Sequence, residues 1–368
     1  MSRRLSRGVS WSSTGDTPRS EKGQAVSGVL SIQASVLHDF YVQVLVRTGV
    51  PEADAHLAAA VRLEGALRLP AGLDAFTVIR LQNTVHRLQA GGINPTPRLR
   101  VVHERATSAL LDGDNGLGAV VGTRAMDYCL TKAHQQGFAL VGVRNSTTLE
   151  MMAYYAMRAL EHQTIGFAAT NTELKIGVPP WGGVTPALGN NPFAIAIPGG
   201  QGPALVLDMS VIATRPQGVV REGETSTRGP IGSAFLPRPV IGEHKGSGLA
   251  LVLEVLTGVL TGAGFGQDHA PAYLEAPDAQ YNLGHLFGAL DPTLFMPLAQ
   301  FSARIDRLRT EIKQGQREPG VERLILPGEL EHERRETRLR QGIPVHADAP
   351  NVLRTFCETL GLDSPLAR

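Results

Sequence analysis

The sequence changes character near Gly166, and this change limits the folds that the chain can adopt. Before this point apolar residues recur at helical spacing, as between Leu37 and Leu45, and helices are predicted from about residue 35, at 53–67 and at 75–90. After it, short apolar runs such as Phe193–Ile197 alternate with Gly, Pro and Asn, which is typical of strands joined by loops. The irregular order of helices and strands predicts an α/β class without a regular βαβ array.

Other elements follow from the same two periodicities. Buried strands are predicted at 109–111, 139–143 and 204–207. Helices are predicted at 119–136, 246–262 and 301–313. The first 28 residues are rich in Ser, Arg, Gly and Thr and have few apolar residues, so they are predicted to be a disordered tail before one domain at 29–368. A targeting segment and a misassigned start codon both remain possible readings of this tail.

The composition excludes several classes of protein. The 368 residues are 42% hydrophobic and 19% charged, which is ordinary for a globular protein. A net charge of +1 gives no field to recruit nucleic acid or acidic membranes, and no apolar run is long enough to span a bilayer. Cys129 and Cys357 lack metal-binding spacing, so we expect buried thiols, no metal site and a cytoplasmic location.

A glycine-rich segment resembles a dinucleotide-binding fingerprint without matching it. Gly116, Gly118 and Gly122 follow a short predicted strand, but the last glycine comes one residue late. No acidic residue stands clearly at the end of a second strand. We therefore favour a turn and close helix packing over a Rossmann-type site.

Polar and glycine clusters in the second half of the chain predict a cleft. Buried strands that end in such residues usually line one, and glycine lets the backbone approach a flat cofactor or a phosphate closely. Lys245, at the start of a predicted helix, is suited to a phosphate because free N–H groups and a positive dipole end lie there. The clusters are NT (171–172), PWGG (180–183), GNNP (189–192), LDMS (207–210) and HKGSG (244–248).

Taken in order, these and other segments resemble the malate/L-lactate dehydrogenase-like oxidoreductases. The family includes ureidoglycolate, sulfolactate and diketogulonate enzymes and reductases of cyclic piperideine and pyrroline carboxylates. The resemblance extends from about Ser31 to the end of the chain. Its most specific segments are AGGINP (90–95), DGDNGLG (112–118), NS (145–146), PWGG (180–183), NPFAIA (191–196), LDM (207–209), HKGSG (244–248), GHLF (284–287) and PGE (327–329).

The resemblance implies a non-Rossmann, NAD(P)-binding α/β fold with a mixed sheet, and a homodimer. It divides the domain into a helical segment at 29–100, a cofactor-binding part at about 101–300 and a C-terminal return segment at 301–368. It also implies hydride transfer at a small 2-oxo or 2-imino carboxylate, in which the cofactor carries the hydride and the protein supplies position, charge and a proton. The residues implied to bind NAD or NADP are Asn171, Thr172, Leu207, Asp208, Met209, Ser210, Lys245, Gly246, Gly328 and Glu329.

The chain departs from the family at its expected histidines. The family's Ser-His-Gly motif falls on residues 75–77, so Phe76 replaces one histidine while the following Arg80 is retained. The second histidine is replaced by Thr148, and a glycine two residues later by Glu150. Phenylalanine carries no exchangeable proton, and threonine has no useful pKa near neutrality. Arg80, Thr148 and Phe76 are nevertheless the residues that the resemblance places at the reacting centre.

Two further departures leave alternatives open. The segment between Met209 and His244 is short and lacks the family's Gly-Trp-Ala and Thr-x-Asp-Pro segments. Other histidines could replace the missing pair, namely His86, His134, His162, His244 and His285.

Two functions are therefore predicted. One is a working reductase or dehydrogenase, in which Arg80 offers a guanidinium fork to a substrate carboxylate. Loss of a general acid matters less for a cyclic imine, which water can protonate, than for a ketone. The other is an impaired family member that acts as a cofactor-binding or regulatory pseudoenzyme.

Overall fold

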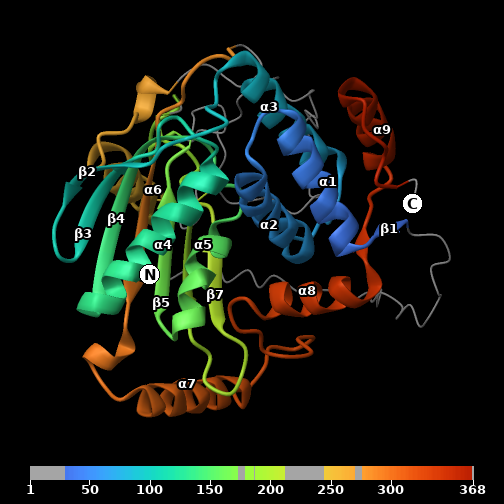
Figure 1. Cartoon of the computed structure of the whole chain (residues 1–368). Helices are drawn as coiled ribbons and strands as arrows, with labels where there is room; N and C mark the ends of the chain where they lie inside the picture. The colour runs from blue at the N-terminus through green and yellow to red at the C-terminus, as the bar shows by residue number, and fades with distance from the viewer. Residues whose placement is uncertain (1–29, 173–178, 186, 212–243, 270–275, 367–368) are drawn as a thin grey trace, which may run out of the picture.

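The helical N-terminal part and a large sheet lie side by side in the protein (Figure 1). The computed structural model describes residues 30–172, 179–185, 187–211, 244–269 and 276–366. The tail predicted at 1–28 lies outside the described residues. The helical part contains α1 (Ala34–Arg47), α2 (Glu52–Arg68) and α3 (Ala75–Ala90).

Helix α3 has clear start and stop signals. The Asp74 carboxylate accepts a hydrogen bond of 2.8 Å from the backbone N–H of Thr77, and Gly91 ends the helix with a φ of +85°. An N-terminal acidic cap and a left-handed C-terminal glycine are the usual helix boundaries. The helix therefore has the bounds predicted from the sequence.

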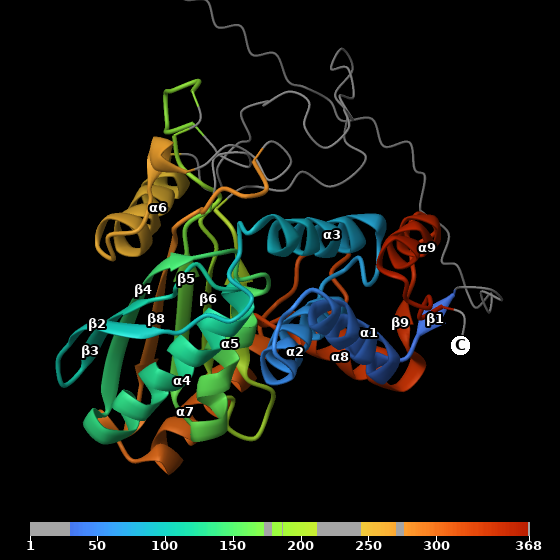
Figure 2. The same cartoon turned by 45° about the horizontal axis from the view of Figure 1, so that its top comes forward.

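The C-terminal segment returns to the helical part. A short ladder pairs β1 (Ser31–Ile32) with β9 (Ile343–Pro344), and α9 (Ala349–Leu360) packs against α3. Helix α8 (Glu329–Gln341) packs against α2, and Figure 2 shows it beside α1 and α2 in the helical part. The two ends of the domain thus close the helical part together.

Within the described residues, the sheet has seven strands in the order β2-β3-β4-β8-β5-β6-β7. Strands β3 and β4 pair parallel, and the other neighbours pair antiparallel. Its mixed character matches the predicted fold class. The strands are β2 (Arg100–Glu104), β3 (Ser108–Asp112), β4 (Phe138–Ser146), β5 (Ile165–Thr170), β6 (Phe193–Ile197), β7 (Leu205–Met209) and β8 (Leu283–Leu290).

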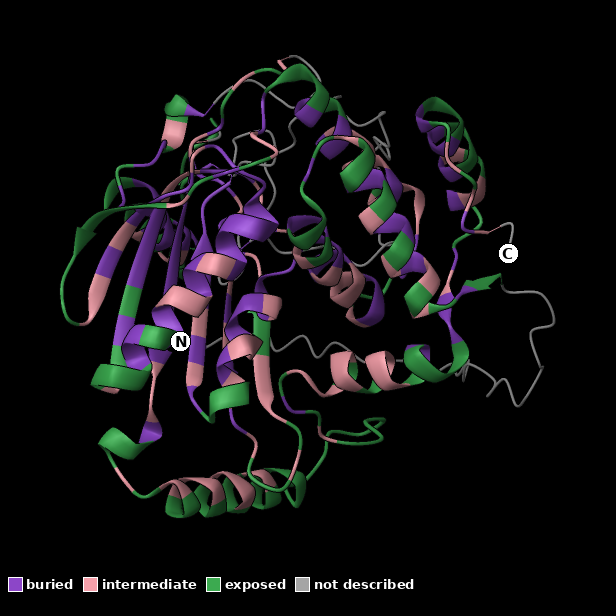
Figure 3. Ribbon diagram, in the orientation of Figure 1, coloured by how far each residue is buried: buried purple, intermediate pink, exposed green. Residues whose placement is uncertain are grey.

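One face of the sheet is covered by α4 (Gly118–Gln136) and α5 (Met152–Arg158). Alternate residues of β4, namely Ala139, Val141 and Val143, are fully buried in the main core with these helices. The opposite face carries α6 (His244–Glu254), which continues as a π-helical turn at Val255–Val259. Burial alternates along β6, whereas the central strand β8 is buried along nearly its whole length (Figure 3). Helix α7 (Leu298–Lys313) crosses one end of the sheet and has an exposed outer side.

The glycine fingerprint is explained by packing. A Cβ at Gly118 would lie 2.3 Å from the Thr147 carbonyl oxygen, and one at Gly122 would lie 2.6 Å from the Leu149 side chain. At Gly116 a Cβ would lie 2.4 Å from Pro97. These glycines let α4 approach the loop that follows β4. The prediction of a turn and close helix packing is confirmed.

The remaining predictions about elements have mixed outcomes. The strand at Phe193–Ile197 is confirmed to the residue, and the helix predicted at 246–262 is divided between α6 and the π-helical turn. Both cysteines are free and buried, as predicted. Within the described residues, no helix is long and apolar enough to cross a membrane, and no group of three or more His, Cys, Asp or Glu residues is arranged to hold a metal ion.

Candidate active site

Polar segments next to five strands meet at one end of the sheet, where the strand termini lie. Strands β4, β5 and β7 finish at this end, while β6 and β8 begin there, because these neighbouring strands pair antiparallel in the order given above. The register places Thr170 opposite His285, and Phe193 opposite both Ala169 and Met209. Segments that are far apart in sequence therefore lie together at one end of the sheet, and the cleft predicted there stays a prediction.

The loop after β4 is fixed at several points. The Thr147 hydroxyl accepts a 2.8 Å hydrogen bond from the Gly118 backbone N–H and donates one of 3.0 Å to the Gly116 carbonyl. The Tyr155 hydroxyl donates to the Leu149 carbonyl at 2.5 Å. This loop therefore holds Thr148, which is partly buried, in a defined position.

Glu150, in the same loop, pairs with two arginines. Its Oε1 lies 2.7 Å from Arg62 on α2, and its Oε2 lies 3.4 Å from Arg80 on α3. Burial favours the neutral acid, but the guanidinium groups of Arg62 and Arg80 outweigh it and hold the pKa of Glu150 below its ordinary value. The carboxylate is thus ionised at neutral pH.

The backbone of Glu150 explains why a glycine was expected there. Its φ of +69° lies in the left-handed region, which costs a residue other than glycine about 1–3 kcal/mol. The two ion pairs offset this cost. The sequence singled out the position because glycine is replaced there, but it gave no signal for Arg62, which lies within an Ala-rich helix.

Phe76 and Arg80 occupy neighbouring turns of α3. The Phe76 residue is 54% exposed, and the Arg80 guanidinium carbon lies 5.8 Å from the centroid of its ring. The Arg80 side chain is 38% exposed, compared with 17% for Glu150. The structure therefore brings Phe76, Arg80 and the Thr148–Glu150 loop to one partly accessible place.

His285 is unsuited to replace the missing histidines as a proton donor. It is wholly buried in the central strand β8, and its Nδ1 lies 2.7 Å from the Thr170 hydroxyl. Burial lowers its pKa to about 3, although hydrogen bonds to the backbone at Gly284 and Thr147 act in the opposite direction. The imidazole is therefore neutral at physiological pH.

Among the predicted cofactor residues, Asn171 and Thr172 use their side chains within the protein. Asn171 accepts a hydrogen bond from the Gly284 N–H at 2.9 Å and donates one to the Gly264 carbonyl at 2.8 Å. The Thr172 hydroxyl exchanges hydrogen bonds with Asn190. These two residues hold the chain after β5 in place.

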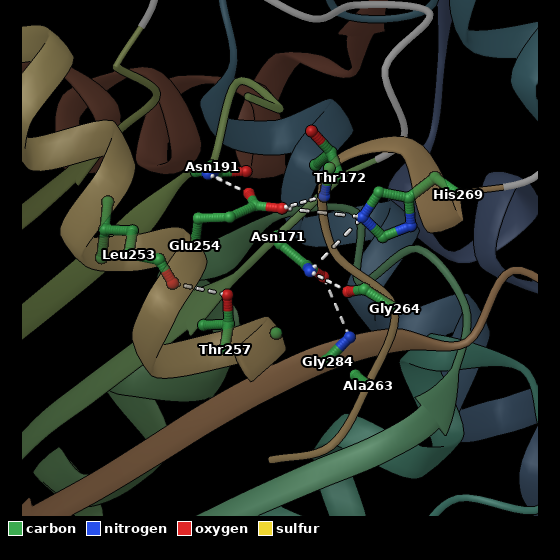
Figure 4. A network of polar contacts seen from close by, with 12 residues as sticks. Asn171, Thr172, Asn191, Leu253, Glu254, Thr257, Ala263, Gly264, His269 and Gly284 are labelled. Carbon is green, nitrogen blue, oxygen red and sulfur yellow. Dashed lines mark hydrogen bonds and ion pairs between the residues drawn. The ribbon is translucent and has the colours of Figure 1, made fainter. Parts of the chain in front are cut away.

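A buried polar network next to Asn171 was not predicted from the sequence (Figure 4). The Glu254 carboxylate accepts hydrogen bonds from Asn191 at 2.6 Å and from the Gly266 backbone N–H at 3.0 Å. His269 lies 3.8 Å from the same carboxylate and 3.5 Å from the Asn171 amide. The network joins α6, β6 and the segment before β8.

Strand β7 supplies Leu207, Asp208 and Met209 at the same end of the sheet, and Ser210 follows the strand. The Asp208 carboxylate accepts a 2.8 Å hydrogen bond from the backbone N–H of Ala153, in the first turn of α5. Although the residue as a whole is exposed, desolvation of its carboxyl group raises the pKa to about 6. The hydrogen bond from Ala153 opposes this shift, and Glu331 adds to it. Asp208 thus links β7 to the helix that follows the Glu150 loop.

Lys245 and Gly246 lie in the first turn of α6. Lys245 is exposed, Gly246 is buried, and the Ser247 hydroxyl accepts a 2.9 Å hydrogen bond from the Trp181 backbone N–H. The indole of Trp181 is largely exposed and lies 6.1 Å from the His244 ring. A cation and an aromatic ring therefore stand beside the first described residues of α6.

Gly328 and Glu329 lie next to β7. Gly328 has a φ of +86°, and a Cβ there would lie 2.9 Å from Val206. Glu329 pairs with Lys313 at 2.5 Å, and this bond together with one from the Leu326 N–H outweighs burial and lowers its pKa. The carboxylate of Glu329 is therefore already committed to α7 and the preceding turn.

The chain belongs to the malate/L-lactate dehydrogenase family, whose model matches residues 32–228 and 213–354. It is 34% identical over 366 residues to a malate dehydrogenase of Pyrococcus abyssi, which covers 93% of this chain and 98% of the relative. It is 32% identical over 340 residues to an L-sulfolactate dehydrogenase of Methanocaldococcus jannaschii, covering 88% and 95%. The chain is thus a member of an oxidoreductase family along nearly its whole length.

The fold leads to the same family. The malate dehydrogenase structure from Pyrococcus horikoshii OT3 aligns with a TM-score of 0.81 and 33% identity, covering 94% of this chain and 99% of that one. The resemblance and the fold class predicted from the sequence are confirmed.

Proposed function

We propose that the protein is an enzyme that transfers hydride between NAD or NADP and a small 2-oxo/2-hydroxy acid or cyclic 2-imino acid. The observation that carries this proposal is Arg80, a partly exposed guanidinium on α3 that lies beside the loop after β4, in a protein of this family. Arginine offers a planar fork that matches a carboxylate. Relatives are named malate, L-sulfolactate and ureidoglycolate (NAD(+)) dehydrogenases, and each of these named substrates is a small acid.

The donor set at α6 fits the phosphates of such a cofactor. Lys245 supplies a positive charge, the first turn of α6 supplies backbone N–H groups, and the exposed Trp181 offers an aromatic face. When bound, NAD(P)H supplies the hydride. We assign the phosphates to Lys245 and Gly246, and we assign to the ends of β5 and β7 the role of shaping the rest of the cofactor cleft.

The cofactor assignment predicts the effect of removing the Lys245 amine. Lys245→Ala should weaken NAD(P)H binding by about 1–3 kcal/mol, the range for a lost hydrogen bond to a charged group. Calorimetry with NADH and NADPH measures this, and it also decides between the two cofactors. Unchanged affinity for both in a folded variant would remove Lys245 from the site.

The residues at the reacting centre favour an imine over a ketone. A ketone oxygen must gain a proton as the hydride arrives, and neither Phe76 nor Thr148 titrates near neutral pH. A cyclic imine can be protonated in water before it binds. We therefore propose a cyclic 2-imino acid as the favoured substrate class.

The direct test is a substrate panel. The purified protein is given 2-oxo acids and cyclic 2-imino acids with NADH or NADPH, and the loss of reduced-cofactor absorbance is followed. Turnover that falls in kcat/KM on Arg80→Lys, which keeps the charge but loses the bidentate fork, supports the proposal. Wild-type kinetics in that variant would exclude Arg80 from substrate binding.

A second candidate is a cofactor-binding pseudoenzyme. It is favoured by the loss of both expected histidines and by the Glu150 carboxylate that pairs with Arg80. Tight cofactor binding without turnover on the whole panel would support this candidate over the enzyme.

We further propose a cytoplasmic homodimer that pairs through the α6 side of the sheet. This face exposes apolar side chains on α6 and the π-helical turn, while Phe138 and Leu140 of β4 are each 37% exposed. Both strand residues share the face of Gly142, which lies against Thr261 after the π-helical turn. Exposed apolar patches of this kind mark protein interfaces. The exposed residues of the helix are Leu251, Val252, Val255, Val259 and Leu260.

A further inference from the structure

Glu150 is the charged side chain that most changes the character of this site. It stands where a glycine was expected, in a backbone conformation that disfavours any other residue. Such unfavourable conformations persist only where surrounding structure imposes them, and they cluster at functional sites. The position therefore calls for an explanation beyond the local fold.

The loop holds the Glu150 carboxylate in one place. The preceding residue is tied down through the Leu149 carbonyl, and the following helix is tied to Asp208 through the Ala153 N–H. The two carboxylate oxygens are then divided between the arginines. Oε1 contacts the buried Arg62 at 2.7 Å, and Oε2 lies toward the more exposed Arg80 at 3.4 Å.

The two ion pairs of Glu150 have different roles: the pair with Arg62 is structural, and the pair with Arg80 lies at the site. Arg62 also donates a 2.8 Å hydrogen bond to Thr84, so it belongs to the packing between α2 and α3. Arg80 is the residue proposed to bind a carboxylate. The Oε2 atom of the Glu150 carboxylate therefore lies beside the guanidinium that is proposed to bind the substrate.

Paired charges of this kind select among substrates. A ligand with only a carboxylate is attracted by Arg80 and repelled by Glu150, whereas a ligand with adjacent negative and positive charges can pair with both. A protonated cyclic 2-imino acid has this arrangement, because its iminium nitrogen is bonded to the carbon that carries the carboxylate. We infer that Arg80 and Glu150 form a paired-charge subsite that selects zwitterionic 2-iminio carboxylates over 2-oxo acids.

The inference rests on the proposed function and gives Glu150 a chemical role in it. An adjacent opposite charge favours the charged form, so Glu150 raises the pKa of the bound imine and keeps it protonated. In the reduction, hydride from NAD(P)H bonds to the ring carbon and the C=N π pair moves to the nitrogen, giving a secondary amine and oxidised cofactor. Glu150 stays ionised and acts as a counter-ion, not as the proton donor.

A binding experiment tests selectivity without turnover. Calorimetry compares L-pipecolate, which carries an ammonium next to its carboxylate, with cyclohexanecarboxylate, which carries only the carboxylate. Each is titrated with the reduced cofactor present, so that the amine cannot be oxidised. Glu150→Gln should weaken L-pipecolate binding about 10- to 100-fold, the range for a lost charge-assisted contact, and leave cyclohexanecarboxylate binding equal or stronger.

A matched variant controls for the backbone. Gln163 also has a positive φ, +54°, and is exposed far from the site at the end of a 3-10 turn, so Gln163→Gly relieves the backbone without touching the charges. It should change neither affinity, while Glu150→Gly should reproduce the loss of L-pipecolate selectivity. Equal weakening of both ligands in Glu150→Gln would overturn the inference, because Glu150 would then only position Arg80. Unchanged binding of both ligands would overturn it as well.

A pH profile gives a second measure. In the imine-reducing enzyme, Glu150→Gln should move the alkaline fall in kcat to lower pH, because the bound imine loses its proton more easily; an unmoved profile contradicts the inference. If wild type reduces no substrate, the proposed function fails. The binding of L-pipecolate and cyclohexanecarboxylate then still tests the paired-charge subsite independently of turnover.

Discussion

Phe76 and Thr148 determine which proton transfers the site can support. Neither side chain titrates near neutrality, and His285, the buried histidine of the central strand, remains neutral because burial lowers its pKa to about 3. The nearby ionised groups, Arg80 and Glu150, are held in an ion pair. The ionised groups of the site, Arg80 and Glu150, are therefore suited to binding a charged ligand and not to donating a proton.

Restoring the two histidines tests this view. The double variant Phe76→His with Thr148→His should gain 2-oxo acid reduction by about two to four orders of magnitude, the usual value of a positioned proton donor. Imine reduction should change much less. Steady-state rates on a matched ketone and imine measure both. If the variant folds and binds cofactor but still reduces no 2-oxo acid, the missing histidines are not the main reason why 2-oxo acids are not reduced.

Asp208 makes stability depend on pH. Desolvation raises its folded-state pKa to about 6, above the 3.8 of an unperturbed aspartate, so folding favours the protonated form. Its contribution to stability is complete below about pH 4, falls as the pH rises to about 6, and is constant above that. Ionised Asp208 is therefore a destabilising group at neutral pH.

Asp208→Asn should remove this dependence. The amide oxygen can still accept the Ala153 hydrogen bond, so the melting temperature should rise relative to wild type more at pH 7.5 than at pH 4. Thermal denaturation of both proteins at the two pH values measures the difference. Equal changes at both pH values would show that Asp208 ionises in the folded protein as it does in the unfolded chain.

At the scale of elements, α4 depends on its close approach to the loop after β4. Gly118→Ala would place a Cβ 2.3 Å from the Thr147 carbonyl and 2.4 Å from that of Thr148, and backbone atoms cannot move aside cheaply. We expect a loss of about 1–3 kcal/mol in the free energy of unfolding, as for overpacked cores. Denaturant unfolding followed by circular dichroism measures it.

The matched control for this prediction is a helical glycine with open space. Among the described residues, no atom lies within 4 Å of a Cβ built at Gly248 in α6. Gly248→Ala should stabilise the protein by about 0.5–1 kcal/mol through helix propensity. Equal effects of both substitutions would refute the packing explanation of the glycine fingerprint.

The elements that were predicted well have strong local signals. Helix α3 has both caps and a regular apolar stripe, and β6 is a short apolar run bounded by an Asn-Pro pair and a Pro-Gly-Gly turn. Helix α8 was missed because its sequence, ELEHERRETRLRQ, has almost no apolar face and packs instead through arginines such as Arg338, which donates to carbonyls at the end of α2. Strand β8 was missed because its position between β4 and β5 depends on pairing with distant residues.

The site was predicted in outline. The order of motifs identified the family. The structure places Arg80 near the Phe76 ring and beside Glu150, in the loop that contains Thr148, and the roles of Arg80, Phe76 and Thr148 stay predictions. Arg62 and the Glu254–His269 pair had no sequence signal, since a charged residue within a helix is normally solvated. Their partners come from segments 88 and 15 residues away, and such pairings become visible only in the fold.

At the scale of the whole molecule, the α6 face predicts assembly. Leu251→Asp combined with Val255→Asp adds two charges to the exposed apolar face and should convert a dimer into a monomer of 39.3 kDa. Light scattering after size exclusion measures the mass. Val46→Asp, at an exposed apolar site on α1, is the control and should leave the dimer intact. A wild-type monomer would refute the proposed interface.

The central place of β8 has a consequence for how the chain is made on the ribosome. Strand β5 is complete at Thr170, but the slot between β4 and β5 is filled only when Leu290 has been synthesised, 120 residues later. At about 5–20 residues per second, this leaves two unpaired strand edges for roughly 6–24 s. A nascent chain of this protein thus passes through a stage in which its sheet is open in the middle, and chaperones that shield strand edges should bind it there.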